Sequence, residues 1–231
     1  MTARPSVIAH RGIHADGTTE NTMGAFERAL ELGADMIELD VRRSGEGELA
    51  ILHDHAHGGI ALDSCSLDEL EQRTGFRPPL LSEVLDWAAG RIALDVELKE
   101  GGYTEQLAPL LMRFVATGGE LLVTSFIDPL LAHLSRLAPS LRLGLLLAWT
   151  ALGATERAHA AGASVVLPEM KLVDESLVAA VSDAGLELIV WDFIAAKHAP
   201  LLTDRRVAGV ITDDVPGALA ARAASGTGAT D

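Results

Sequence analysis

Short runs rich in Val, Ile and Leu alternate along nearly the whole chain with longer runs rich in Ala and Leu. Three of the longer runs stop at Leu32-Gly33, Ala161-Gly162 and Ala184-Gly185, where a glycine can form the left-handed C-cap of a helix just before the next short run. Strands that alternate with helices in this way indicate βαβ units and a parallel sheet covered on both faces. The repeat of helix, glycine and strand therefore predicts one continuous α/β domain.

About eight such units in roughly 220 residues predict a single (β/α)8 TIM-type barrel, with a doubly wound sheet as the structural alternative. The expected strands are Ser6–His10, Asp35–Val41, Glu48–His53, Arg91–Leu98, Leu121–Phe126, Leu141–Leu146, Ser164–Leu167, Leu186–Trp191 and Gly209–Thr212. The expected helices are Asn21–Leu32, Ser82–Ala88, Thr104–Ala116, Pro129–Leu137, Thr150–Ala161, Ser176–Asp183, Ala195–Leu202 and Pro216–Ala223.

Two segments of the chain do not belong to the eight expected strand-and-helix units. The expected strand Glu48–His53 follows the second strand at hairpin distance, so we predict a small extra hairpin strand after strand 2. From about Ala224 to Asp231 the chain consists mostly of Ser, Gly, Thr and Ala, which is typical of a disordered tail. We therefore expect a barrel domain over residues 1–223 and a disordered tail over residues 224–231.

Composition excludes several classes of protein. The formal net charge of −15 argues against a nucleic-acid or anionic-membrane surface, because such surfaces need clustered Lys and Arg. The chain has no uninterrupted apolar stretch long enough to span a membrane and no signal-peptide profile, so we expect a cytoplasmic protein without membrane insertion. Cys65 is the only cysteine, in what we expect to be a surface loop, which excludes an internal disulfide and a multi-thiolate zinc site.

Carboxylates stand near the carboxyl ends of two expected strands, where barrels collect their functional groups. Glu38 and Asp40 are two residues apart in the second strand and therefore share a face, and Glu97 lies near the end of the third strand. A pair of carboxylates beside a third one makes an oxygen-rich cage that suits Mg²⁺ or Ca²⁺ better than a soft metal. Because the chain is acidic, binding of an anionic substrate would need a local source of positive charge, and a metal ion in this cage would supply it.

Histidines and cationic side chains stand at the same expected rim. The first strand ends in His10-Arg11, and the hairpin strand ends in His53. Lys99 is the only lysine before position 171 and interrupts an apolar strand end, where an ammonium group can hold a phosphate oxygen or form a salt bridge with a neighbouring carboxylate. Two histidines, two carboxylates and an arginine at one rim are parts for metal-assisted phosphate chemistry.

Several polar and aromatic residues near this rim also suit a different role. Asn21 is the only asparagine, and an ordinary helix N-cap accounts for it at least as well as a functional role does. His53, His55 and His57 are also compatible with the two-histidine metal site of amidohydrolase-type barrels. That site needs its His-x-His pair on the first strand and further histidines at later strand ends, which the expected strands lack. Trp191 suits the core and the wall of a substrate pocket equally well.

A series of motifs extends over nearly the whole chain. In order, they are Ala9-His10-Arg11-Gly12, Glu20-Asn21-Thr22, Gly33–Val41, His53-Asp54, Pro79–Leu85, Val96-Glu97-Leu98-Lys99, Thr124-Ser125-Phe126, Trp191 and Gly209–Pro216. This series resembles the glycerophosphodiester phosphodiesterase family. The resemblance implies a metal-dependent (β/α)8-barrel enzyme, a phosphoric diester hydrolase that converts glycerophosphodiesters to sn-glycerol 3-phosphate and an alcohol.

The resemblance also implies a metal site. By position, Glu38, Asp40 and Glu97 would hold one divalent cation, either Mg²⁺ or Ca²⁺. Glu20 would orient this site or the neighbouring Arg11. In similar enzymes the ion also engages a glycerol hydroxyl, which attacks phosphorus and expels the alcohol before water opens a cyclic phosphate.

The remaining implied roles concern proton transfer and substrate binding. His10 and His53 would act as general base and general acid, because the entering oxygen must lose a proton and the leaving oxygen must gain one. Arg11 and Lys99 would bind the phosphate of a small-molecule glycerophosphodiester, whose dianionic transition state needs positive charge. Trp191 would support the site as part of the pocket wall.

The sequence departs from the family pattern just after His53-Asp54. Residues 55–59 replace a Leu-x-Arg-Thr-Thr segment that would border the leaving group, so the identity of the alcohol stays open. A lysophospholipase D-like activity on lipids is an alternative, but it needs an apolar rim or a membrane-binding loop, which the short segment 55–65 hardly supplies. A non-catalytic barrel that only binds is a further alternative, which loss of a histidine or metal carboxylate would favour, and none is missing.

Overall fold

The protein, as a computed structural model, is described over residues 4–14 and 17–226. Within these residues, eight parallel strands close into a ring, because β1 (Ser6–His10) pairs with both β2 (Met36–Arg43) and β11 (Val207–Thr212). The rest of the ring consists of β6 (Ala93–Leu98), β7 (Leu121–Ser125), β8 (Arg142–Leu147), β9 (Val165–Pro168) and β10 (Glu187–Val190). This closure confirms the (β/α)8 barrel, and the doubly wound alternative is wrong because an open sheet leaves two strands as edges.

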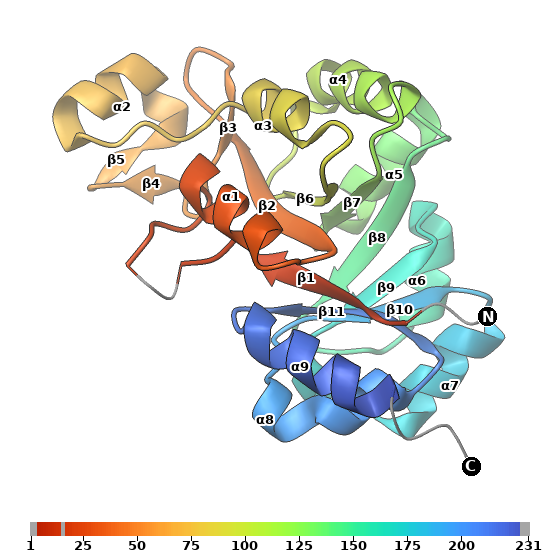
Figure 1. Cartoon of the computed structure of the whole chain (residues 1–231). Helices are drawn as coiled ribbons and strands as arrows, with labels where there is room; N and C mark the ends of the chain where they lie inside the picture. The colour runs from red at the N-terminus through yellow and green to blue at the C-terminus, as the bar shows by residue number, and fades with distance from the viewer. Residues whose placement is uncertain (1–3, 15–16, 227–231) are drawn as a thin grey trace.

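Helices cover the outside of the ring (Figure 1). They are α1 (Met23–Glu31), α3 (Leu81–Ala88), α4 (Thr104–Ala116), α5 (Asp128–Leu137), α6 (Ala154–Ala161), α7 (Glu175–Asp183), α8 (Ala195–His198) and α9 (Val215–Gly226). The expected helix Ala195–Leu202 is divided into α8 and a 3-10 helix over Ala199–Thr203, because Pro200 has no N–H to continue an α-helix. No helix of the described residues is long and apolar enough to cross a membrane.

Helix α9 extends into the segment that was expected to be a disordered tail. Because α9 runs through Gly226, residues 224–226 of that tail are helical. The rest of the tail, residues 227–231, lies outside the described residues. The boundaries of the barrel domain stay a prediction.

The expected extra strand is present as β3 (Leu49–Ile51), which pairs with β2 in antiparallel orientation outside the ring. The chain then forms a side lobe over residues 55–76 that the sequence pattern did not predict. The side lobe contains β4 (Ala56–His57), β5 (Ile60–Ala61), a 3-10 helix over Leu62–Ser64 and α2 (Leu67–Thr74). In Figure 1 this side lobe lies at the upper left, beside the barrel.

Cys65 belongs to the small core of this side lobe. Its relative exposure is 5%, and it clusters with Leu62, Leu67 and Leu70. The expectation of a surface loop was therefore wrong, because the polar residues on either side of Cys65 obscured apolar positions that face one interior. Burial raises the pKa of the Cys65 thiol, which keeps it protonated.

The lumen of the barrel changes from apolar to polar along its strands. A buried cluster fills it with one or two side chains per strand, including Ile8, Met36, Ala93 and Leu122. Two residues further along, the same face of these strands carries His10, Glu38, Asp95 and Thr124. Alternation along the strands thus delivers ionisable groups to the carboxyl ends.

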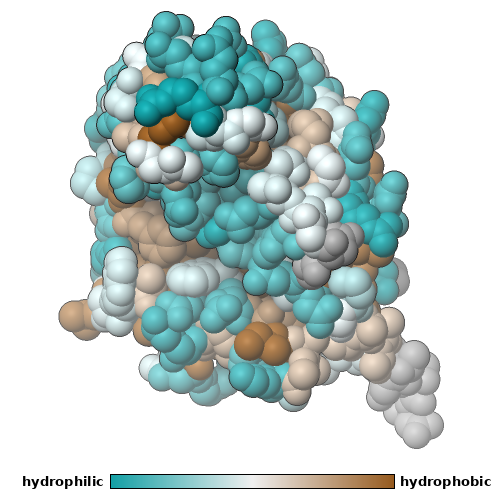
Figure 2. Space-filling view, turned by 90° about the vertical axis from the view of Figure 1, so that its left-hand side faces the viewer, coloured by the Kyte–Doolittle hydropathy of each residue, from teal (hydrophilic) through white to brown (hydrophobic). Residues whose placement is uncertain are grey.

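β1 runs from the N-terminus at the right of Figure 1 toward the left, so the carboxyl ends of the parallel strands lie on the left-hand side. Figure 2 views the molecule from that side, on which the side lobe also lies. This face is mostly hydrophilic, and its hydrophobic residues form small, separate patches.

Candidate active site

A cavity of about 150 Å³ opens at the carboxyl ends of the strands. One part of its lining is polar or charged, and consists of His10, Arg11, Glu38, His53, Asp95, Glu97, Lys99 and Thr124. The other part is apolar, and consists of Phe126, Leu146, Trp191 and Ile211. The barrel therefore brings together most of the residues selected from the sequence. Asp40 and Glu20 do not line the cavity, but Asp40 contacts Arg11 and Lys99, and Glu20 contacts Arg11.

Three buried carboxylates form an oxygen cluster beside this cavity. Glu38, Asp40 and Glu97 each offer an oxygen, and these oxygens all lie within 4.8 Å of one another. Strand register explains the cluster, because Asp40 lies opposite Glu97 in the pairing of β2 with β6. Burial, together with the charges of Asp40 and Glu97, raises the pKa of Glu38 well above its usual value.

The chemistry of this cluster suits a hard divalent cation. Its donors are all carboxylate oxygens, the ligands that Mg²⁺ and Ca²⁺ prefer. Asp40 Oδ1 is buried and has no hydrogen-bond partner among the described residues, although Lys99 Nζ lies 3.2 Å from it. An acceptor without a hydrogen bond beside two further carboxylates is suited to coordinate a metal ion.

Two cationic side chains adjoin the cluster. Lys99 Nζ lies 2.7 Å from Glu97 Oε1 and 3.2 Å from Asp40 Oδ1. Arg11 Nε lies 3.1 Å from Asp40 Oδ2, and the Arg11 guanidinium donates to Glu20 Oε1 at 2.9 Å. Burial alone would raise the pKa of Asp40, but the charges of Lys99 and Arg11 outweigh burial and lower it. Asp40 is therefore ionised, and the salt bridge that the sequence suggested for Lys99 is present.

A tight turn after β1 places Arg11. Arg11 and Gly12 both have left-handed backbones, with φ of 54° and 79°. A Cβ atom on Gly12 would lie 2.6 Å from the carbonyl carbon of Ala25, so only glycine lets α1 approach this closely. The turn also allows the Arg11 N–H to donate to Glu38 Oε2 at 3.0 Å.

Each cavity histidine has a carboxylate partner. His10 Nδ1 lies 2.7 Å from Asp213 Oδ1, and His53 Nδ1 lies 2.8 Å from Asp54 Oδ1. These hydrogen bonds lower the pKa of Asp213 and of Asp54, so both are ionised acceptors and the histidine Nδ1 atoms are the donors. In the neutral rings, Nε2 is therefore free to accept a proton, and His10 Nε2 lies 4.0 Å from Glu38 Oε2.

Two supporting residues were not assigned to the site from the sequence. Thr22, not Asn21, is the N-cap of α1, so the N-cap role expected for Asn21 was wrong. Asn21 is 1% exposed and its amide donates to Asp40 Oδ2 at 2.7 Å. Asp213 also escaped assignment, because it lies 203 positions from His10 and only the closure of β1 on β11 brings them together.

Trp191 lies at the cavity, whereas His55 and His57 lie in the side lobe. Trp191 lines the cavity, packs edge-on against Phe126 at 5.9 Å and also packs against the apolar cluster of the lumen, so it stands between the cavity and the core. His55 is exposed, and His57 stacks against Phe76 at 4.4 Å. Neither possible metal cluster in the described part of the chain includes His53, His55 or His57, so the two-histidine alternative gains no support.

Asp95 is expected to make the stability of the metal-free protein depend on pH. Burial raises its pKa to about 7, above the usual Asp value of about 3.9, so folding takes up a proton between these pH values. The contribution is intact below about pH 4 and is lost as pH rises through 7. We expect the free energy of unfolding to fall by about 2 to 3 kcal/mol between about pH 5 and pH 8 on account of this group.

Urea unfolding of chelator-treated protein at the two pH values measures this fall. Asp95→Asn should show a smaller fall, with the remainder due to other buried carboxyls such as Glu38. An identical pH dependence in the two proteins would contradict the assignment.

A closed (β/α)8 barrel with ionisable groups at the carboxyl ends of its strands is the arrangement found in the class of TIM-barrel enzymes. Comparison with known proteins narrows this class. Residues 10–216 match the "Glycerophosphoryl diester phosphodiesterase family". The chain therefore belongs to this family, and it is a phosphoric diester hydrolase.

Individual relatives agree with this assignment. A glycerophosphodiester phosphodiesterase from Caldanaerobacter subterraneus is 29% identical over 229 residues, which cover 90% of this chain and 93% of that protein. The crystal structure of a glycerophosphodiester phosphodiesterase from Agrobacterium tumefaciens has a TM-score of 0.79 and 25% identity, covering 94% of this chain and 99% of that one. A phosphodiesterase from Oleispira antarctica, solved in complex with the product sn-glycerol-3-phosphate, has a TM-score of 0.81 and 22% identity, covering 94% and 96%.

Proposed function

We propose that this chain hydrolyses glycerophosphodiesters to sn-glycerol 3-phosphate and an alcohol, with one divalent cation, Mg²⁺ or Ca²⁺. One observation carries the proposal: two cationic side chains and two histidines line one cavity together with Glu38 and Glu97, and the third clustered carboxylate, Asp40, contacts this lining. The product complex of the Oleispira antarctica relative supports the same product for this chain.

Glu38, Asp40 and Glu97 would hold the cation. When bound, such an ion supplies Lewis acidity toward an oxygen of the substrate. Asn21 fixes the Asp40 carboxylate by donating to its Oδ2 at 2.7 Å, as outer partners of metal ligands commonly do. Glu20 fixes Arg11 in turn, which is its supporting role in this proposal.

Arg11 and Lys99 would hold the phosphate. Both border the cavity, and both keep their charge at neutral pH, since nearby carboxylates raise their pKa despite burial. A phosphodiester carries one negative charge and its transition state carries two, so fixed cations stabilise the transition state more than the bound substrate.

His10 is assigned as the first general base. With Nδ1–H held by Asp213, its Nε2 accepts the proton of the glycerol hydroxyl next to the ester while that oxygen bonds to phosphorus. His53 gives a proton to the leaving alcohol as the old P–O bond breaks. Burial lowers the pKa of His53, so its protonated form is a stronger acid than ordinary imidazolium. In the second step the roles reverse, and water opens the cyclic phosphate.

Release of glycerol 3-phosphate tests the proposal. Purified protein is assayed on glycerophosphocholine, glycerophosphoethanolamine and glycerophosphoglycerol, after chelation and after addition of Mg²⁺ or Ca²⁺. We expect chelated protein to lose most of its activity and to regain it with metal, because the metal-free cluster lacks the Lewis acid and its clustered carboxylates repel one another and the substrate. Full activity after exhaustive chelation, with no metal in elemental analysis, would contradict the role of the cluster.

Hydrolysis of lysophospholipids is a second candidate function, favoured by two exposed apolar residues. Trp149 is 86% exposed and Leu152 is 83% exposed, in the loop that follows β8 at the same end of the barrel as the cavity. If these residues contact an acyl chain, Trp149→Ser should raise the KM for lysophosphatidylcholine and leave that for glycerophosphocholine unchanged. An equal effect on both substrates would remove this candidate.

A further inference from the structure

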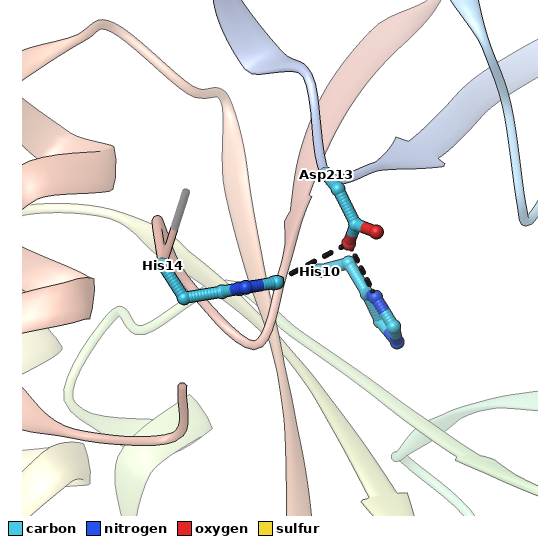
Figure 3. A group of neighbouring side chains, drawn as sticks. All are labelled: His10, His14 and Asp213. Carbon is cyan, nitrogen blue, oxygen red and sulfur yellow. Dashed lines mark hydrogen bonds and ion pairs between the residues drawn. The ribbon is translucent and has the colours of Figure 1, made fainter. Parts of the chain in front are cut away.

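A second cluster of possible metal ligands consists of His10, His14 and Asp213 (Figure 3) and shares no residue with the three carboxylates. His10 Nδ1 lies 2.7 Å from Asp213 Oδ1, and His14 Nε2 lies 3.5 Å from the same oxygen. All three ligand atoms lie within 4.8 Å of one another. A cavity of about 240 Å³, lined in part by His10 and Asp213, gives access to the cluster.

We propose that His10, His14 and Asp213 bind a transition-metal dication such as Zn²⁺, and that this binding inhibits the enzyme. Two imidazole nitrogens and one carboxylate oxygen are a donor set typical of Zn²⁺, whereas the carboxylate cluster suits harder ions. The two sites therefore differ in the metals that they select.

The two distances to Asp213 are close to those of tetrahedral coordination, and His10 Nδ1 and His14 Nε2 lie within 4.8 Å of each other. Zn–N and Zn–O bonds of about 2.0 to 2.2 Å place neighbouring ligand atoms roughly 3.3 to 3.6 Å apart. The 3.5 Å separation of His14 from Asp213 already meets this requirement. The 2.7 Å hydrogen bond from His10 would have to lengthen by less than about 1 Å, which is small for an exposed Asp213 side chain.

His14 supplies an independent sign of an absent partner. Its Nε2 atom is buried, and its 3.5 Å contact with Asp213 Oδ1 is too long or too poorly aligned to count as a hydrogen bond with any described residue. A buried polar atom without a good hydrogen bond is costly, and a metal bond at this nitrogen would remove the cost. No role in the proposed hydrolysis accounts for His14.

Inhibition follows from the two nitrogens of His10, and this step rests on the proposed function. A metal on Nδ1 displaces the proton that His10 donates to Asp213, and that proton leaves to solvent. A neutral imidazole then carries its remaining proton on Nε2. Nε2 has no free lone pair in that state, so His10 cannot accept the proton of the attacking hydroxyl.

The test uses the full chain in millimolar Mg²⁺, which occupies the carboxylate cluster, with Zn²⁺ added in the micromolar range. Bound zinc is measured by equilibrium dialysis and elemental analysis, and Co²⁺ in place of Zn²⁺ gives a visible spectrum of the same site. Wild-type protein should bind one zinc and lose activity in parallel. His14→Ala should keep its basal activity and bind zinc at least about 10-fold more weakly.

His133→Ala is the matched control, because His133 lies on α5 and contacts Glu105 instead. It should bind zinc and be inhibited like the wild type. Equal zinc affinity in wild type and His14→Ala would overturn the site, and His14→Gln replaces the alanine variant if the latter does not fold. Zinc bound through His14 without loss of activity would uphold the site and overturn the role of His10. If no hydrolysis is found at all, the zinc stoichiometry still decides the site.

Discussion

Replacing either cavity histidine with alanine is expected to lower kcat by about 10² to 10⁴, because each transfers a proton in the transition state. His10→Ala removes the base that accepts from the glycerol hydroxyl, and His53→Ala removes the acid that protonates the leaving alcohol. Both side chains are 34% exposed, so their loss should leave the fold intact. Steady-state kinetics on glycerophosphocholine, with circular dichroism for the fold, measures the effect.

The side lobe provides the matched controls for this prediction. His55 is exposed, and His57 packs on Phe76, so alanine at either position should change kcat by less than about 3-fold. If His55→Ala or His57→Ala were inactive while His53→Ala kept its activity, the motif register would be wrong. The two-histidine metal site would then replace the present assignment.

The barrel itself was predictable because its signals are local and repeated. β1 and α4 have the bounds expected from the sequence, and every other expected strand is present. Apolar strands that alternate with glycine-terminated helices leave few alternatives to a closed parallel ring. The side lobe escaped prediction because strands of two residues have no measurable periodicity. The capping box of Ser66 and Glu69 at the start of α2 was the signal that could have revealed the helix.

The site was predictable only as far as its motifs reach. Residues that stand in motifs, such as Glu38 and Lys99, lie around one cavity. The partners that orient them could not be assigned from the sequence, because a helix cap would explain Asn21 in the sequence alone and the contact of Asp213 with His10 depends on ring closure. A cytoplasmic location and the roles of the individual site residues stay predictions.

Lys99→Met is expected to lower kcat by about 10² to 10³, the effect of removing one charged donor from a developing anion. The Lys99 ammonium lies 2.7 Å from Glu97 and borders the cavity, so no other described lysine can replace it. Lys171→Met is the control, because Lys171 is more exposed and pairs with Glu169 after β9. Both variants are assayed with saturating divalent cation, which compensates the carboxylates that Lys99 leaves behind. Equal activity of the two variants would contradict a phosphate-binding role for Lys99.

The same site should discriminate against diesters that lack a neighbouring hydroxyl. If the glycerol hydroxyl is the first nucleophile, the substrate supplies its own attacking group, and His10 only has to remove its proton. Bis(p-nitrophenyl) phosphate has the better leaving group but no such hydroxyl, so it should be cut poorly while glycerophosphocholine is cut well. Phosphorus NMR early in the reaction should detect cyclic glycerol phosphate. Efficient cleavage of the hydroxyl-free diester, with no cyclic species at any time, would instead indicate direct attack by water, because only a water nucleophile is indifferent to the missing hydroxyl.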